Sequence, residues 1–130
     1  MNIAHGALFV AHLVASLAAT VILVVMRSEA KGRLTTRSDA RQNPPRNMAA
    51  RLFHLIPVTG ALVIVTSGGD IRWSEAWVGI GMALYLAGAV VLEARALPAE
   101  RCGEDLTVMR NVEWSLVLLA LAALVMLIQF

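Results

Sequence analysis

The chain has little charge, few aromatic residues and a single cysteine. Of its 130 residues, 15% are charged, 5% are aromatic and 58% are hydrophobic. Soluble domains carry about 25% charged residues, so this composition excludes a disordered chain and argues against a water-soluble globule. Cys102 is the one cysteine and cannot form a disulfide within the chain. A secreted scaffold held by disulfides is therefore excluded.

Common catalytic and nucleic-acid-binding patterns are also missing. The sequence has no glycine-rich phosphate loop, no Cys-x-x-Cys and no His-Glu-x-x-His. Its most basic segment, residues 27–51, contains no aromatic side chain on which a base could stack. We therefore predict a protein that is not an enzyme and does not bind nucleic acid.

The sequence does contain four long uncharged runs, at residues 3–26, 52–69, 76–92 and 114–130. A helix needs about 20 apolar residues to cross a bilayer, and charged residues at its ends can snorkel to the surface. The runs predict an all-α polytopic membrane protein, a four-transmembrane-helix antiparallel bundle. Its helices are expected at about 3–27, 46–68, 74–97 and 105–129, in one domain covering residues 1–130. Residues 1–5 carry no Lys or Arg, so the first run is predicted to be a retained helix and not a signal peptide.

The basic residues predict the orientation. Most of them fall between the first two runs: Arg27, Lys31, Arg33, Arg37, Arg41, Arg46 and Arg51. Because basic loops stay in the cytoplasm, the loop at 28–45 is expected inside and both termini outside. The 27–51 segment is also expected to contact anionic lipids.

Prolines and small residues predict local features of the helices. Pro57 leaves the Phe53 carbonyl without its helical donor, and Pro98 is expected to end the third helix. Small residues allow helices to approach closely in lipid. The stripes expected to face the bundle are Ala15 and Ala19, then Gly79, Ala83 and Ala87, then Ser115, Ala122 and Gln129.

Histidines in the first helix are the main candidates for a site. His5 and His12 are seven residues apart, which places them on one face of a helix about 10.5 Å apart. Each is a candidate ligand for a metal or haem, or a hydrogen-bonded residue inside the bundle. Met126 is expected at a depth that matches that of His12 only loosely, and a His–Met axial pair is an alternative. The three histidines lie at three depths, which favours no tightly bound cofactor, with haem or copper as the alternatives.

A second candidate site lies at the cytoplasmic side. His54 begins the second helix, Glu93 ends the third and Glu113 begins the fourth. These side chains are expected to meet as a polar cluster, either a proton or metal site or an interfacial ion pair.

Several of these segments together resemble a known family. They are Asn2-Ile3-Ala4-His5, the run Arg51-Leu52-Phe53-His54-Leu55-Ile56-Pro57, Ser67-Gly68-Gly69, and Leu84-Tyr85-Leu86-Ala87-Gly88 after Trp77. The chain resembles small bacterial four-helix membrane proteins related to the copper-resistance D family. The resemblance implies a place in the bacterial inner membrane, and it implies His5 and His12 as positions for copper or haem. It does not imply a catalytic activity.

Two functions follow as hypotheses. The first is a non-catalytic accessory or assembly subunit of a larger membrane complex, or a homo-oligomer, linked to copper or haem handling. Its helices have much apolar surface for lipid or partner helices. The alternative is a small transporter or channel whose polar track is lined by His12, Ser16, Thr59, Thr66 and Gln129.

Overall fold

The computed structural model describes residues 3–36 and 47–128, and this part of the chain is helical without any strand. The elements are α1 (Ile3–Thr36), α2 (Asn47–Thr66), α3 (Ala76–Val91), the π-helix η1 (Leu92–Ala96), α4 (Leu97–Cys102) and α5 (Asp105–Ile128). Because α3, η1 and α4 are continuous, these residues form four helical segments that are long and apolar enough to cross a membrane. The all-α four-helix bundle is confirmed, and the protein is a multi-pass membrane protein.

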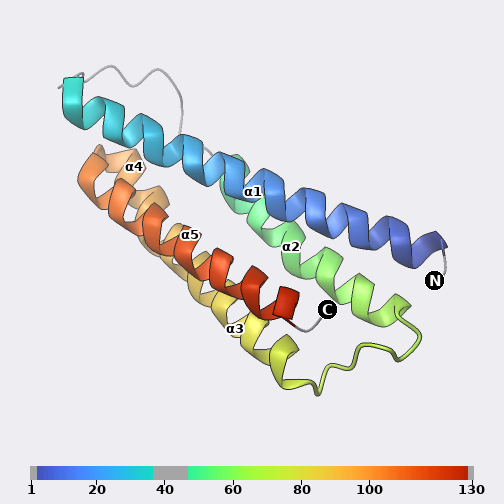
Figure 1. Cartoon of the computed structure of the whole chain (residues 1–130). Helices are drawn as coiled ribbons and strands as arrows, with labels where there is room; N and C mark the ends of the chain where they lie inside the picture. The colour runs from blue at the N-terminus through green and yellow to red at the C-terminus, as the bar shows by residue number, and fades with distance from the viewer. Residues whose placement is uncertain (1–2, 37–46, 129–130) are drawn as a thin grey trace.

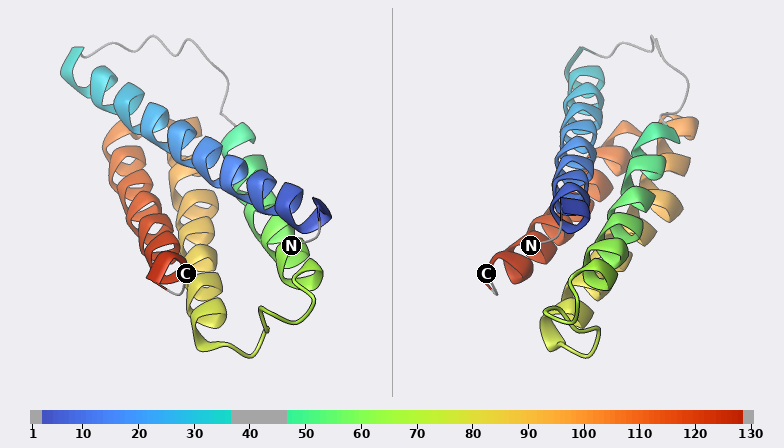
Figure 2. Two further views of the ribbon diagram at one scale, coloured as in Figure 1. Left: turned by 45° about the vertical axis from the view of Figure 1, so that its right-hand side comes forward. Right: turned by 90° about the vertical axis from the view of Figure 1, so that its right-hand side faces the viewer.

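The segments are antiparallel and pack as two pairs (Figure 1). α1 packs on α2, α3 packs on α5, and α1 also packs on α5, whereas α2 and α3 touch at few points. Figure 2 shows the two pairs diverging toward the end that holds the 67–75 loop. We call this end, with the start of α1 and the end of α5, the outer end, after the predicted orientation. The opposite end, where α4 lies, is the inner end.

The first helix is longer than expected. It continues to Thr36, past the end predicted at about residue 27, so residues 28–36 are helix and not loop. Tertiary contacts explain the extension. Ala30 is fully buried, and Arg27 and Arg33 form ion pairs with α5. The rest of the predicted loop, residues 37–45, lies outside the described residues.

Pro98 does not end the third helical segment, so that prediction is wrong. The helix runs on to Cys102, and Gly103 ends it in the left-handed conformation at φ 83°. In an α-helix the Pro98 ring would clash with the Ala94 carbonyl and leave it without a donor. The π-helix η1 ends two residues before Pro98, and the N–H of its C-cap residue Leu97 donates to the Leu92 carbonyl, five residues back. This looser turn lets the helix accommodate the proline.

Two of the three small-residue stripes face the bundle. Ala15 and Ala19 are buried, as are Ser115 and Ala122, while Gln129 lies outside the described residues. The third stripe is wrong, since Gly79, Ala83 and Ala87 are exposed. The packing face of α3 is instead made by Gly81, Tyr85 and Gly88. Both faces of α3 carry small residues, so spacing alone could not identify the face that contacts α5.

The inner half of the bundle is tightly closed. The largest fully buried side chains all lie there: Leu23, Met26, Phe53, Leu92, Val108, Val112 and Ser115. Ser115 Oγ donates to the Gly88 carbonyl at 3.0 Å and joins α5 to α3. A Cβ on Gly88 would lie 3.5 Å from Leu118 Cβ, an ordinary van der Waals distance, so α3 and α5 are in close contact here.

A buried hydrogen bond supplies the donor that Pro57 lacks. The Tyr85 hydroxyl donates to the Phe53 carbonyl, the group that a residue with an N–H at position 57 would satisfy. The two rings also stack, with centroids 5.4 Å apart and planes at 23°. The kink-prone turn of α2 is therefore completed by a side chain of α3.

We expect Tyr85→Phe to lower the free energy of unfolding by about 1–3 kcal/mol, because it leaves a buried carbonyl unpaired while keeping the ring. In a Pro57→Ala background the new backbone N–H at this position can bond to the Phe53 carbonyl, so the same substitution should cost much less. Thermal unfolding of the four proteins in detergent measures this coupling. An equal cost in both backgrounds would contradict the assignment.

Candidate functional site

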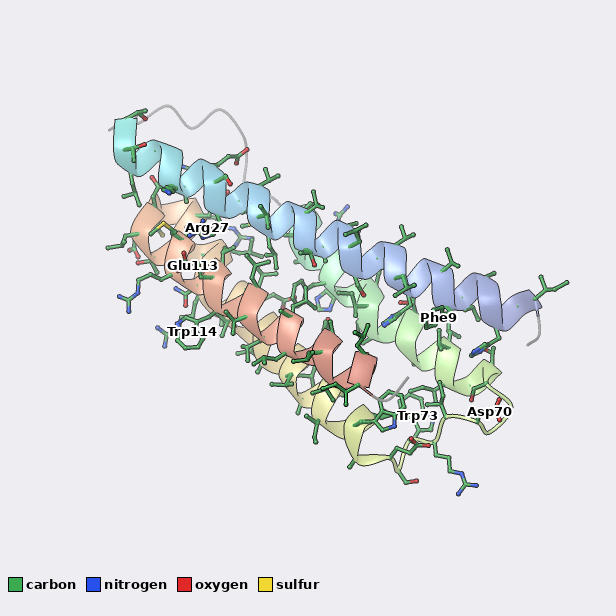
Figure 3. The ribbon with its side chains drawn as sticks, in the orientation of Figure 1. Phe9, Arg27, Asp70, Trp73, Glu113 and Trp114 are labelled. Atoms are coloured by element: carbon green, nitrogen blue, oxygen red, sulfur yellow. The ribbon has the colours of Figure 1, made fainter. Side chains whose placement is uncertain are left out.

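Two neighbouring cavities lie in the outer half of the bundle, where the helix pairs diverge. The larger, of about 400 Å³, lies between α1 and α5, and the smaller, of about 80 Å³, lies between α2 and α3. The same five side chains line both of them: Phe9, His12, Ile56, Tyr85 and Met126. We call the pair the outer cavity. Phe9 extends from α1 toward the interior of the bundle (Figure 3).

His12 is the one ionisable side chain, apart from Tyr85, among the residues that line the outer cavity. Its Nδ1 lies 2.9 Å from Thr59 Oγ1 on α2. The Thr59 hydroxyl itself donates to the Leu55 carbonyl at 2.7 Å. This contact holds the imidazole of His12 against α2, and the ring is among the side chains that line both cavities. Imidazole is a common ligand for metals.

Glycines on the facing helices make room for the His12 and Met126 side chains of the cavity. A Cβ on Gly60 would lie 3.2 Å from His12 Cε1, and a Cβ on Gly81 would lie 3.0 Å from Met126 Cε. Both distances are shorter than ordinary carbon contacts. Gly60 therefore lets the imidazole rest against α2, and Gly81 lets the thioether rest against α3.

His5 lies two turns nearer the outer end and, like His12, contacts a threonine of α2. Its Nδ1 lies 3.2 Å from Thr66 Oγ1, and Thr66 donates to the Leu62 carbonyl at 2.8 Å. Both histidines thus face α2, but His5 is not among the residues that line the outer cavity. Within residues 3–36 and 47–128, no three His, Cys, Asp or Glu side chains come together to hold a metal. Any metal in the cavity would therefore need ligands of other kinds as well.

The structure brings together only part of the expected inner cluster. His54 Nε2 lies 2.6 Å from Glu93 Oε1. Glu113 instead pairs with Arg27 of α1, whose Nη2 lies 2.6 Å from Glu113 Oε1. Figure 3 shows these two side chains meeting between α1 and α5. A third pair, Arg33 with Asp105 at 2.7 Å, also joins these helices.

The polar residues expected to line a track are divided between two places. Ser16 lines the larger cavity beside His12, whereas Thr59 and Thr66 contact the histidines of α1. The Ser16, Thr59 and Thr66 hydroxyls each donate to a carbonyl of their own helix. Gln129 lies outside the described residues.

Some residues of the site were missed by sequence reasoning, namely Gly60, Gly81, Met82 and Tyr85. One signal was present for Tyr85. It is the one tyrosine of the chain, and a proline within an apolar helix requires a donor for the carbonyl four residues before it. Gly81 and Met82 carried no such signal, since small and apolar residues are common throughout membrane helices.

Comparison with known proteins gives no relative: no family model, no curated protein and no solved structure matches the chain.

We expect His12 and Thr59 to be energetically coupled. In a double-mutant cycle with His12→Ala and Thr59→Val, the coupling energy should be about 0.6 kcal/mol, the average for side-chain hydrogen bonds within membranes. Thr66→Val is the matched control, because Thr66 bonds to His5 and should show no coupling to His12. Unfolding in detergent provides the measurement. Coupling of His12 to Thr66 and not to Thr59 would show that the register between α1 and α2 is different.

Proposed function

We propose that the protein is a small non-catalytic accessory or assembly subunit of a larger complex in the bacterial inner membrane, and that it handles copper or haem through the outer cavity. One observation carries the proposal. The imidazole of His12 and the thioether of Met126 line the same cavity in the outer half of the bundle.

The donor set of the cavity suits a soft metal centre. Thioether sulfur and neutral imidazole bind Cu(I), and a His–Met pair is a known axial ligand set for haem iron. Met82 lines the smaller cavity together with His12 and Met126, so a second thioether is within the same space. With so few protein donors, binding is expected to be exchangeable. This agrees with the sequence, which favours no tightly bound cofactor.

The exposed apolar surface supports the accessory role. Only 17–28% of the most apolar window of each spanning segment is buried within the chain, and the lowest value belongs to α1. The rest faces lipid or partner helices. Association in lipid uses van der Waals packing between helices, so we propose that other membrane subunits, or a second copy, cover part of this surface.

The resemblance to the copper-resistance D family supports the same proposal. A transporter or channel is the second candidate. It would use His12 and Ser16, both of which line the larger cavity, and it requires the path to continue through the closed inner half.

We expect the purified protein to bind either about one Cu(I) per chain or one haem, the latter with a Soret band. Titration with Cu(I) against a competing chelator, and separately with haemin, distinguishes the two. His12→Ala should abolish the signal, whereas His5→Ala should keep it, because His5 lies outside the cavity.

Binding of neither probe, or equal loss in both variants, would contradict the metal-handling part of the proposal. The accessory part is tested separately by purification in mild detergent. A co-purifying membrane subunit or a defined oligomer is expected, and a monomer without partners would contradict it.

We also propose that the inner end faces the cytoplasm, as the basic residues predict. Cys102 is exposed at that end and serves as a native reporter. A membrane-impermeant maleimide should leave it unlabelled in intact cells and label it after permeabilisation. In a Cys102→Ser background, Ser74→Cys in the outer loop should be labelled in intact cells. The reverse pattern would overturn the orientation.

A further inference from the structure

A polar groove separate from the outer cavity lies at the inner end, between α2 and the η1–α4 segment. Its volume is about 420 Å³, and it is lined by Ala50, Arg51, His54, Glu93, Leu97, Pro98 and Arg101. We call it the inner groove. Its lining combines two guanidinium groups, one imidazole and one carboxylate.

The continuation of the helix past Pro98 builds one wall of the inner groove. Because the π-turn accommodates the proline, α4 extends to Cys102 and carries Arg101 alongside the start of α2. Had the helix ended at Pro98, Arg101 would belong to the following connection. Arg51, on the other wall, belongs to α2.

The inner groove lies at the depth of lipid headgroups. Arg51 immediately precedes the apolar run of α2, and Glu93 immediately follows the apolar run of α3. Basic pockets between transmembrane helices at this depth are typical sites for acidic headgroups.

The charges of the inner groove favour an anion. His54 Nε2 lies 2.6 Å from Glu93 Oε1. The lining holds the guanidinium groups of Arg51 and Arg101 and the one carboxylate of Glu93, which gives it a positive balance. The planar guanidinium fork matches the oxygens of a phosphate.

An apolar surface continues from the inner groove toward the middle of the bilayer. Since α2 and α3 touch at few points, their facing sides leave room between them. Val58 lies one turn beyond His54 and is 56% exposed, and Val90 lies about one turn before Glu93 and is 63% exposed. Leu62 and Leu86 extend these two exposed rows by a further turn. Acyl chains attached to a phosphate in the groove would lie on this surface.

We propose that the inner groove binds one anionic diacyl phospholipid, with its phosphate between Arg51 and Arg101 and its acyl chains along α2 and α3. This differs from general attraction of lipids to the basic 27–51 segment, since it also requires Arg101 from the opposite wall of the groove. It is independent of the outer cavity and its metal.

Native mass spectrometry of the full-length protein in detergent tests the site, with dioleoyl phosphatidylglycerol as the probe and dioleoyl phosphatidylcholine as the neutral comparison. We expect one tightly retained phosphatidylglycerol per chain. Each of Arg51→Gln and Arg101→Gln should weaken its binding about fivefold, which corresponds to about 1 kcal/mol per basic residue. Arg95→Gln is the matched control, because Arg95 is exposed on η1 but does not line the groove.

The Glu93→Gln variant is expected to change lipid binding in the opposite direction. It removes a like charge beside the phosphate, so it should tighten binding, a change that loss of folding cannot produce. Equal weakening by Arg95→Gln, or no change in either groove variant, would overturn the proposal. Displacement of the lipid by excess inorganic phosphate would assign the site to soluble phosphate and would also overturn it.

Discussion

The arrangement of the bundle depends on one backbone carbonyl that its own helix cannot satisfy. Pro57 removes the donor for the Phe53 carbonyl, and in a membrane interior an unpaired carbonyl is costly. The Tyr85 hydroxyl supplies the missing hydrogen bond and fixes α3 beside α2 at this level. Ser115 then joins α5 to α3 through the Gly88 carbonyl. These two bonds close the inner half of the bundle, where the largest fully buried side chains also lie.

Closure of the inner half leaves the outer half open. The helix pairs diverge toward the outer end (Figure 2), and the cavities in that half have His12 and Met126 in their walls. The opening is maintained by glycines where a larger residue would displace these side chains. The same architecture therefore accounts for a closely packed end and an end that holds cavities.

Ion pairs at the inner end set the register of helices that are distant in sequence. Arg27 and Arg33 of α1 meet Glu113 and Asp105 of α5, and His54 of α2 meets Glu93 of η1. Such partly exposed pairs contribute about 0–1 kcal/mol each. Their effect is on register more than on stability.

The sequence by itself determined the fold class, the four spanning segments, the inward faces of α1 and α5, and the need of the Phe53 carbonyl for a donor. Each follows from a local property: the length of an uncharged run, helical spacing, or the missing N–H of a proline. Only the tertiary structure decided the packing face of α3, the extension of α1 to Thr36, and the passage of the helix through Pro98. The sequence also placed His12 on an inward face, but the partners of His12, Glu93 and Glu113 depend on how the helices are rotated and how deep each one sits. Apolar helices that are similar on every side carry no local signal for rotation or depth, so contacts between helices decide both.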